Sequence, residues 1–91
     1  MAYSIVFRKS AQKQIRRLPK MAVARITIAI DALADDPRPA NCKKMQGVDS
    51  IYRIRVGDHR VIYQVDDNIV TVEVIKVGSP GQSPLNIEDA F

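Results

Sequence analysis

Hydrophobic and polar residues follow two different periods along this chain, and the change of period predicts where strands give way to helices. Residues 2–7 alternate one by one, with Tyr3, Ile5 and Phe7 on one face, which is the pattern of a half-buried strand. From residue 10 to residue 36 the apolar residues recur every three or four positions, as they do on amphipathic helices. From Ser50 the period returns to two, so we expect strands again.

A proline divides the helical region into two predicted helices. Ser10 suits the N-cap of the first helix. The apolar stripe of this helix consists of Ala11, Ile15 and Leu18. Pro19 ends it, and a second helix begins near Lys20 and stops at the Asp-Asp-Pro sequence of residues 35–37. We therefore expect a helical hairpin whose outer faces are basic.

The second half of the chain predicts a loop followed by a small sheet. Residues 37–47 hold two prolines and mostly polar residues, which favours a loop with Lys43 and Lys44 in solvent. We expect an antiparallel meander of three strands, at residues 51–56, 59–65 and 69–77. The predicted fold class is α+β: an N-terminal strand, a two-helix hairpin and a three-stranded antiparallel meander, in one domain of residues 1–78. Residues 79–91 are expected to form a flexible tail.

Charge is unevenly distributed along the chain. The formal net charge is +4, from 14 Lys and Arg against 10 Asp and Glu, which favours an anionic partner such as nucleic acid. The basic residues gather before the first acidic residue, Asp31. Our candidates for RNA contact in the helical hairpin and the loop are Arg16, Arg17, Lys20, Lys43 and Lys44. The alternative is that these side chains form an ordinary solvated surface.

The single cysteine and the single histidine restrict the chemistry that we expect. Because Cys42 is the single cysteine of this sequence, we expect no internal disulfide and no zinc cluster. His59 has no second histidine to share a metal. Residues 1–8 alternate where a signal peptide would have a continuous apolar core. We therefore expect a cytoplasmic protein without metal or cofactor, in which neither Cys42 nor His59 is catalytic.

A predicted β-hairpin gathers arginines on one face of the sheet. With Gly57 and Asp58 as a two-residue loop, Arg55 lies opposite Arg60. The core face of this hairpin then holds Tyr52, Ile54, Val56, Val61, Tyr63 and Val65, and the other face holds Arg53, Arg55, Arg60 and Gln64. Because the guanidinium groups repel one another, one interpretation is that they bind a phosphodiester. The other is that carboxylates such as Asp58 or Glu73 hold them at a solvated surface.

The same stretch of sequence resembles a known family of toxins. The residues are YRIRVGDHRVIYQVDD from Tyr52 to Asp67, followed by VTVEVIKVG, with the opening YSIVF and the Leu18-Pro19 helix break. Together they resemble the RelE/ParE superfamily, and are more similar to RelE than to ParE, over residues 1 to about 78. RelE-like toxins are metal-independent endoribonucleases that cut messenger RNA on the ribosome, and each is held inactive by a cognate antitoxin. The basic surface expected of this chain suits an antitoxin that is acidic and partly disordered when free.

The resemblance implies a site and also shows where this chain departs from the family. Basic residues on the second and third strands bind the RNA and stabilise the scissile phosphate in that family, and they correspond here to Arg53, Arg55 and Arg60. Family members usually continue with a basic residue and then a tyrosine. This chain has Ser79 or Pro80, and Leu85 or Asn86, in their places. These differences leave open an attenuated toxin fold that still binds its antitoxin. The scaffold shared within the superfamily also leaves open a ParE-type inhibitor of DNA gyrase.

Overall fold

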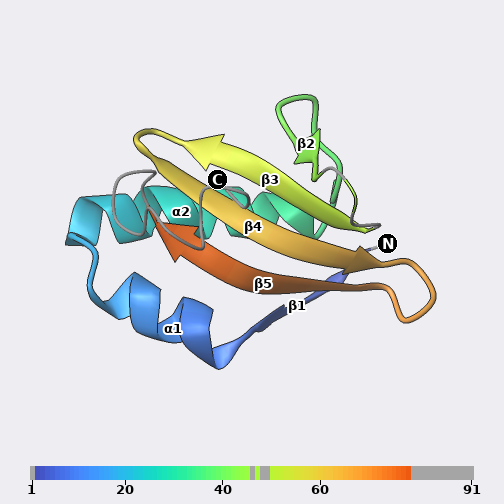
Figure 1. Ribbon diagram of the computed structural model, residues 1–91, viewed down its shortest axis with the longest axis horizontal. Helices are drawn as coiled ribbons and strands as arrows, with labels where there is room; N and C mark the ends of the chain where they lie inside the picture. The colour runs from blue at the N-terminus through green and yellow to red at the C-terminus, as the bar shows by residue number, and fades with distance from the viewer. Residues whose placement is uncertain (1, 46, 48–49, 79–91) are drawn as a thin grey trace.

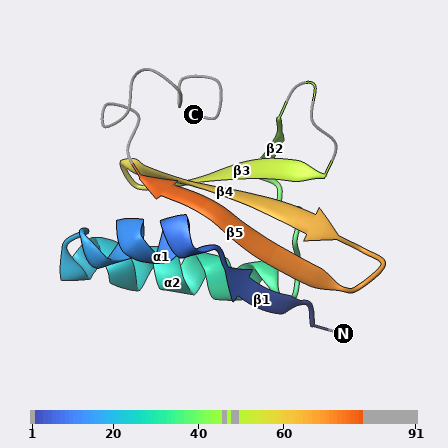
Figure 2. The same cartoon turned by 60° about the horizontal axis from the view of Figure 1, so that its bottom comes forward.

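Two helices cover one face of a mostly antiparallel sheet. The computed structural model describes residues 2–45, 47 and 50–78. Within these residues the elements are β1 (Ser4–Phe7), α1 (Lys9–Arg16), α2 (Lys20–Leu33), β2 (Lys43–Lys44), β3 (Ile51–Val56), β4 (His59–Asp66) and β5 (Thr71–Gly78). The strand order is β1-β5-β4-β3-β2 (Figure 1). Only the β1–β5 pair is parallel among these described strands, and both helices lie on the same side of the sheet (Figure 2).

The predicted order of elements is confirmed, and the start of α1 is corrected. The N-cap of α1 is Arg8 and not Ser10. The Ser10 hydroxyl is used elsewhere, because it donates a hydrogen bond to the carbonyl oxygen of Ile75 at 3.1 Å. The second helix begins at Lys20, as predicted, with Pro19 at its N-cap. Its buried side chains are Ile26, Ile30 and Leu33, which recur at the predicted helical spacing.

The core lies between the helices and the predicted face of the hairpin. Tyr63, Val61 and Val74 are completely buried there. Ile54 and Val65 belong to the same cluster, and Tyr52 and Val56 pack against it, so the predicted core face is confirmed. Of the residues expected to share one face of the first strand, Tyr3 and Ile5 pack on this cluster. Phe7 remains 37% exposed.

The loop predicted over residues 37–47 contains a short strand that the sequence does not predict, although Lys43 and Lys44 are exposed as expected. Lys43 and Lys44 form a short strand whose partners on β3 are Arg53 and Tyr52. The two lysines carry no alternating pattern, and the strand exists because the edge of β3 offers unpaired backbone groups. The last strand also starts later than predicted, at Thr71, because the turn after β4 extends to Val70, which has a positive φ of 51°.

Two expectations remain, one about the location of the protein and one about the tail after residue 78. Among the described residues, no helix is both long enough and apolar enough to cross a membrane. The tail predicted over residues 79–91 lies outside the described residues, as do the positions of Ser79, Pro80, Leu85 and Asn86. The domain boundary at residue 78 therefore stays a prediction.

Candidate functional site

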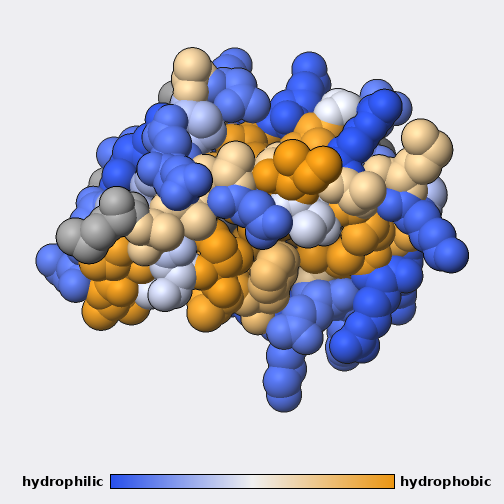
Figure 3. Space-filling model, turned by 180° about the vertical axis from the view of Figure 1, so that it is seen from behind, coloured by the Kyte–Doolittle hydropathy of each residue, from blue (hydrophilic) through white to orange (hydrophobic). Residues whose placement is uncertain are grey.

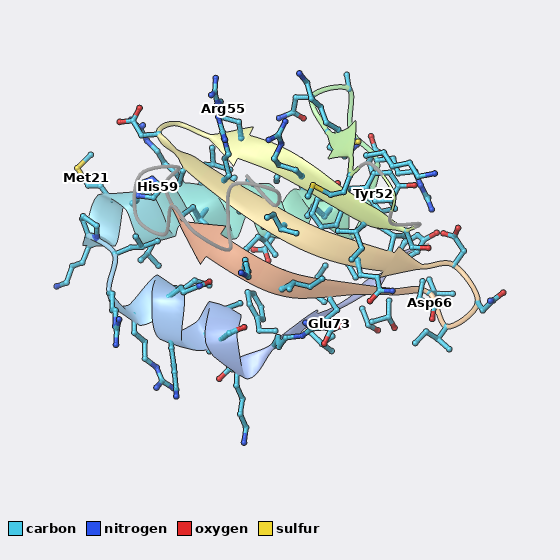
Figure 4. All side chains as sticks on the ribbon, viewed as in Figure 1. Met21, Tyr52, Arg55, His59, Asp66 and Glu73 are labelled. Atoms are coloured by element: carbon cyan, nitrogen blue, oxygen red, sulfur yellow. The ribbon has the colours of Figure 1, made fainter. Side chains whose placement is uncertain are left out.

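The β3–β4 hairpin has the predicted register. Arg55 lies opposite Arg60, and Tyr52 lies opposite Tyr63. Gly57 provides the positive φ of 61° that this two-residue turn requires. Since successive side chains of a strand point to opposite faces, the burial of Ile54 and Val61 in the core sends Arg53, Arg55 and Arg60 to the face away from the helices. Figure 4 shows Arg55 projecting outward from β3.

A hollow of about 420 Å³ lies on this open face of the sheet. We call it the cationic hollow, and its described lining residues are Asn41, Lys43, Arg53, Arg55 and Arg60. The hollow thus contains the three arginines that the sequence analysis proposed together. It also contains Lys43, which reaches it because β2 pairs with β3 directly opposite Arg53. The volume lies in the range of about 300 to 1,000 Å³ typical of small-ligand sites.

The positive charges in the cationic hollow lie close enough to affect one another. Partial burial lowers the pKa of the Arg60 guanidinium, and the neighbouring charges of Arg55 and Arg53 lower it further. An arginine remains protonated in spite of such a shift, so the repulsion among the three groups persists. A bound anion would offset this repulsion, and a phosphate group matches guanidinium donors in geometry as well as in charge.

The carboxylate of Glu73 pairs with Arg8, which lies outside the cationic hollow. It accepts a hydrogen bond from Arg8 at 3.2 Å. Figure 4 shows Glu73 on the β5 side of the sheet, away from Arg55.

A polar cluster around Arg38 fixes the connection that leads from α2 to the cationic hollow. The Arg38 guanidinium pairs with Asp67 at 2.9 Å, its Nε donates to the Tyr52 hydroxyl at 3.0 Å, and its Cζ lies 5.3 Å from the centre of the Tyr52 ring. The Tyr3 hydroxyl also donates to Asp67, at 2.7 Å. Hydrogen bonds from Tyr3 first and Arg38 second lower the pKa of the Asp67 carboxyl. We call these four residues the Arg38 cluster.

Neither Asn41 nor the Arg38 cluster is predicted by the sequence pattern. Arg38 and Asp67 are 29 positions apart, and Tyr3 and Asp67 are 64 positions apart. No periodicity relates residues at such distances. The one available signal was the pair of prolines around Arg38, which indicates a rigid connection without showing its partners.

The other proposed RNA contacts lie outside the cationic hollow. Arg16, Arg17 and Lys20 are exposed at the end of α1 and the start of α2. Lys44 pairs with Tyr52, so its side chain is on the opposite side of β2 from that of Lys43. The structure therefore brings only Lys43 of this group to the arginines.

His59 and Cys42 also lie apart from the cationic hollow. His59 lines a separate hollow of about 310 Å³ with Met21, Arg25 and Asp58. Cys42 is half-buried and packs against the core. In the described part of the chain, no three His, Cys, Asp or Glu side chains are grouped so that they could hold a metal ion.

Comparison with known proteins identifies the family. The model of the ParE toxin of the type II toxin-antitoxin system parDE matches residues 5–84. The chain belongs to the RelE/ParE superfamily of toxins. Over 90 residues it is 30% identical to the mRNA interferase toxin RelE of Escherichia coli, a match that covers 97% of this chain and 94% of the relative.

Solved structures agree with membership of the RelE/ParE superfamily. An archaeal RelE–RelB complex from Pyrococcus horikoshii matches with a TM-score of 0.79 and 30% identity, covering 91% of this chain and 100% of that chain. The intact Escherichia coli RelBE toxin-antitoxin complex matches with a TM-score of 0.77 and 32% identity, covering 86% and 96%. The α+β fold and the membership expected from the sequence are both confirmed, and the chain is a RelE-family toxin of a type II toxin-antitoxin system.

Proposed function

We propose that this toxin cuts messenger RNA on the ribosome and that the cationic hollow binds the scissile phosphate. The observation that carries the proposal is the convergence of Arg53, Arg55, Arg60 and Lys43 on one open hollow. The name of the Escherichia coli relative, mRNA interferase toxin RelE, supports the same activity.

The residues of the cationic hollow suit a reaction in which the RNA supplies its own nucleophile. The 2′-hydroxyl gives its proton to water and its oxygen attacks the adjacent phosphorus, while the bond from phosphorus to the 5′-oxygen breaks and that oxygen takes up a proton from water. Negative charge grows on the phosphoryl oxygens, and cations held in place by the sheet stabilise it. Arginine is well suited to this electrostatic role and is a poor general base. We therefore assign phosphate binding and charge stabilisation to Arg53, Arg55 and Arg60.

The exposed basic residues outside the hollow suit contacts to surrounding RNA. Arg16, Arg17, Lys20 and Lys44 are exposed, and cations of this kind contact phosphates without reading sequence. We assign them to positioning the toxin on the ribosome.

The helix side of the molecule suits a protein partner. On α2, Met21 is 75% exposed and Ile28 is 70% exposed, and Figure 3 shows hydrophobic groups interspersed with hydrophilic ones over this face. Two structural relatives are toxin-antitoxin complexes. We propose that a cognate antitoxin, acidic and partly disordered when free, binds this toxin and covers apolar surface as it folds.

A second candidate function is inhibition of DNA gyrase, which the match to the ParE toxin model favours. It would act through protein contact and would not need the arginines as a phosphate site. An attenuated toxin that only binds antitoxin is the third reading, and it rests on the sequence of residues 79–91.

Growth inhibition separates these functions. Induced expression of the wild-type chain without antitoxin should arrest growth and stop protein synthesis. Arg60→Ala should relieve the arrest, whereas Arg25→Ala, a basic-residue control outside the cationic hollow, should not. Full toxicity of Arg60→Ala would overturn the RNA-cleavage proposal. Inhibition of gyrase supercoiling by the purified protein would favour the second function.

A further inference from the structure

One residue of the cationic hollow differs in chemistry from the others. Among the described lining residues, Asn41 is the only one without a positive charge. Cationic side chains bind phosphate whatever base is attached to it. The asparagine amide presents one acceptor oxygen and two donor hydrogens. Hydrogen-bonding groups of both kinds can distinguish one base from another.

Asn41 stands in a short segment that is fixed on both sides. The amide N–H of Cys42 donates to the carbonyl oxygen of Pro39 at 2.9 Å, which closes a turn with Asn41 inside it. Before the turn, the Arg38 guanidinium pairs with Asp67 at 2.9 Å. After it, Lys43 is paired with Arg53 on β3. The Asn41 backbone is therefore held relative to the arginines, although Asn41 itself is exposed.

The Asn41 amide is not used in hydrogen bonds within the described part of the chain. None of the side-chain hydrogen bonds between described residues involves Asn41. Asn68 is also an exposed asparagine, but it lies at the β4–β5 turn. The difference between the two asparagines is their position: only Asn41 lines the hollow that holds the arginines.

We propose that Asn41 reads the base attached to the phosphate in the cationic hollow and that the preferred base is adenine. Asparagine pairs bidentately with adenine, donating to N7 and accepting from the N6 amino group. Single-stranded RNA leaves this edge of its bases open to side chains. The inference rests on the proposed function in one respect, namely that a nucleotide phosphate occupies the hollow.

Binding of short RNA tests the inference without requiring cleavage. The probes are four fluorescent trinucleotides that differ only in the central base, each with deoxyribose at that position so that it cannot be cut. Fluorescence anisotropy should show that wild-type protein binds the adenine probe about tenfold more tightly than the others, the size expected of one bidentate pair. Asn41→Ala should bind the four probes within about twofold of one another. Asn68→Ala, the matched control, should keep the wild-type preference.

Three results would overturn the assignment of Asn41. These are equal binding of the four probes by the wild type, an adenine preference that survives in Asn41→Ala, and no measurable binding of any probe. An unchanged urea midpoint should show that Asn41→Ala is folded. If the preference depends on Asn41 but the wild type cuts no messenger RNA on ribosomes, the assignment of Asn41 stands and the proposed catalytic function fails.

Discussion

At the scale of single residues, burial decides what a tyrosine contributes. Tyr52 and Tyr63 lie opposite each other on β3 and β4, with ring centres 5.9 Å apart. Tyr63 is completely buried, and its hydroxyl donates to the carbonyl oxygen of Pro37 at 2.7 Å. Burial raises the pKa of the Tyr63 hydroxyl, which therefore stays protonated as a donor. Tyr52 is less buried, and its hydroxyl accepts from Arg38 instead.

Removal of the Tyr63 hydroxyl should destabilise the fold. Tyr63→Phe leaves the Pro37 carbonyl oxygen without the hydrogen bond that the hydroxyl donates. We expect a loss of about 1 to 2 kcal/mol in the free energy of unfolding, measured by urea denaturation. Tyr52→Phe is the matched control and should cost less, because water can replace the hydroxyl at that more exposed position. Equal losses for the two variants would contradict this account.

The Asp67 carboxyl should make stability depend on pH. Tyr3 and Arg38 hold the pKa of this carboxyl below its ordinary value. A carboxyl with a depressed folded-state pKa stabilises the fold above its unfolded-state pKa, and loses this contribution as the pH falls through its folded-state pKa. Asp67→Asn should therefore be less stable than the wild type at neutral pH. The difference should be modest, because Asp67 is exposed and screened by solvent.

The measurement is the urea midpoint of both proteins from neutral pH to below the ordinary aspartate pKa of about 3.9. The gap between wild type and Asp67→Asn should narrow toward the acid end. A gap that stays constant over this range would show that Asp67 does not contribute through its charge.

At the scale of elements, α1 completes the sheet beyond the end of β1. The parallel pairing of β1 with β5 ends at Phe7 and Val74. Further along β5, the Gln14 side chain accepts a hydrogen bond from the Val77 amide at 2.7 Å, and Ser10 donates to the Ile75 carbonyl oxygen. Side chains of α1 thus satisfy backbone groups that a neighbouring strand would otherwise satisfy.

Loss of the Gln14 contact should expose this edge of β5. Gln14→Leu leaves the partly buried Val77 amide without an acceptor, at an expected cost of about 1 to 2 kcal/mol. Hydrogen exchange at the Val77 amide should accelerate. The control on the same helix is Gln12→Leu, which removes a donor to the exposed Phe7 carbonyl oxygen and should leave Val77 exchange unchanged. Slow Val77 exchange in Gln14→Leu would contradict the assignment.

The elements that sequence could predict are those governed by local patterns. The period of two and the Gly57 turn determine the β3–β4 register, which is why the arginines were correctly placed together. The prediction of an N-cap at Ser10 is wrong because the Ser10 hydroxyl has a distant partner in β5. The strand β2 and the place of Asn41 in the hollow depend on how the α2–β2 connection crosses the edge of β3. Such tertiary contacts leave no periodic signal in one sequence.

At the scale of the whole molecule, the two faces differ in character. The open face of the sheet carries the cationic hollow. The helix face presents the exposed apolar side chains of Met21 and Ile28. This division would let nucleic acid and an antitoxin use separate surfaces, with the sheet as a common support.

Binding of single-stranded RNA should depend on salt in proportion to the cations engaged. The logarithm of the binding constant should fall linearly with the logarithm of salt concentration, by a slope of about −0.7 for each phosphate neutralised. Arg53→Ala should make the slope shallower by about 0.7. Arg25→Ala should leave it unchanged, because Arg25 lines a different hollow. An unchanged slope in Arg53→Ala would remove that arginine from the phosphate site.

We propose above that the toxin cuts messenger RNA on the ribosome, with the scissile phosphate bound in the cationic hollow. The most direct test is primer extension on messenger RNA after incubation of purified toxin with programmed ribosomes. We expect cuts within the codon in the ribosomal A site that are absent with Arg53→Ala and Arg60→Ala. Uncut messenger RNA with wild-type protein that still binds its antitoxin, or undiminished cutting by both variants, would contradict the account.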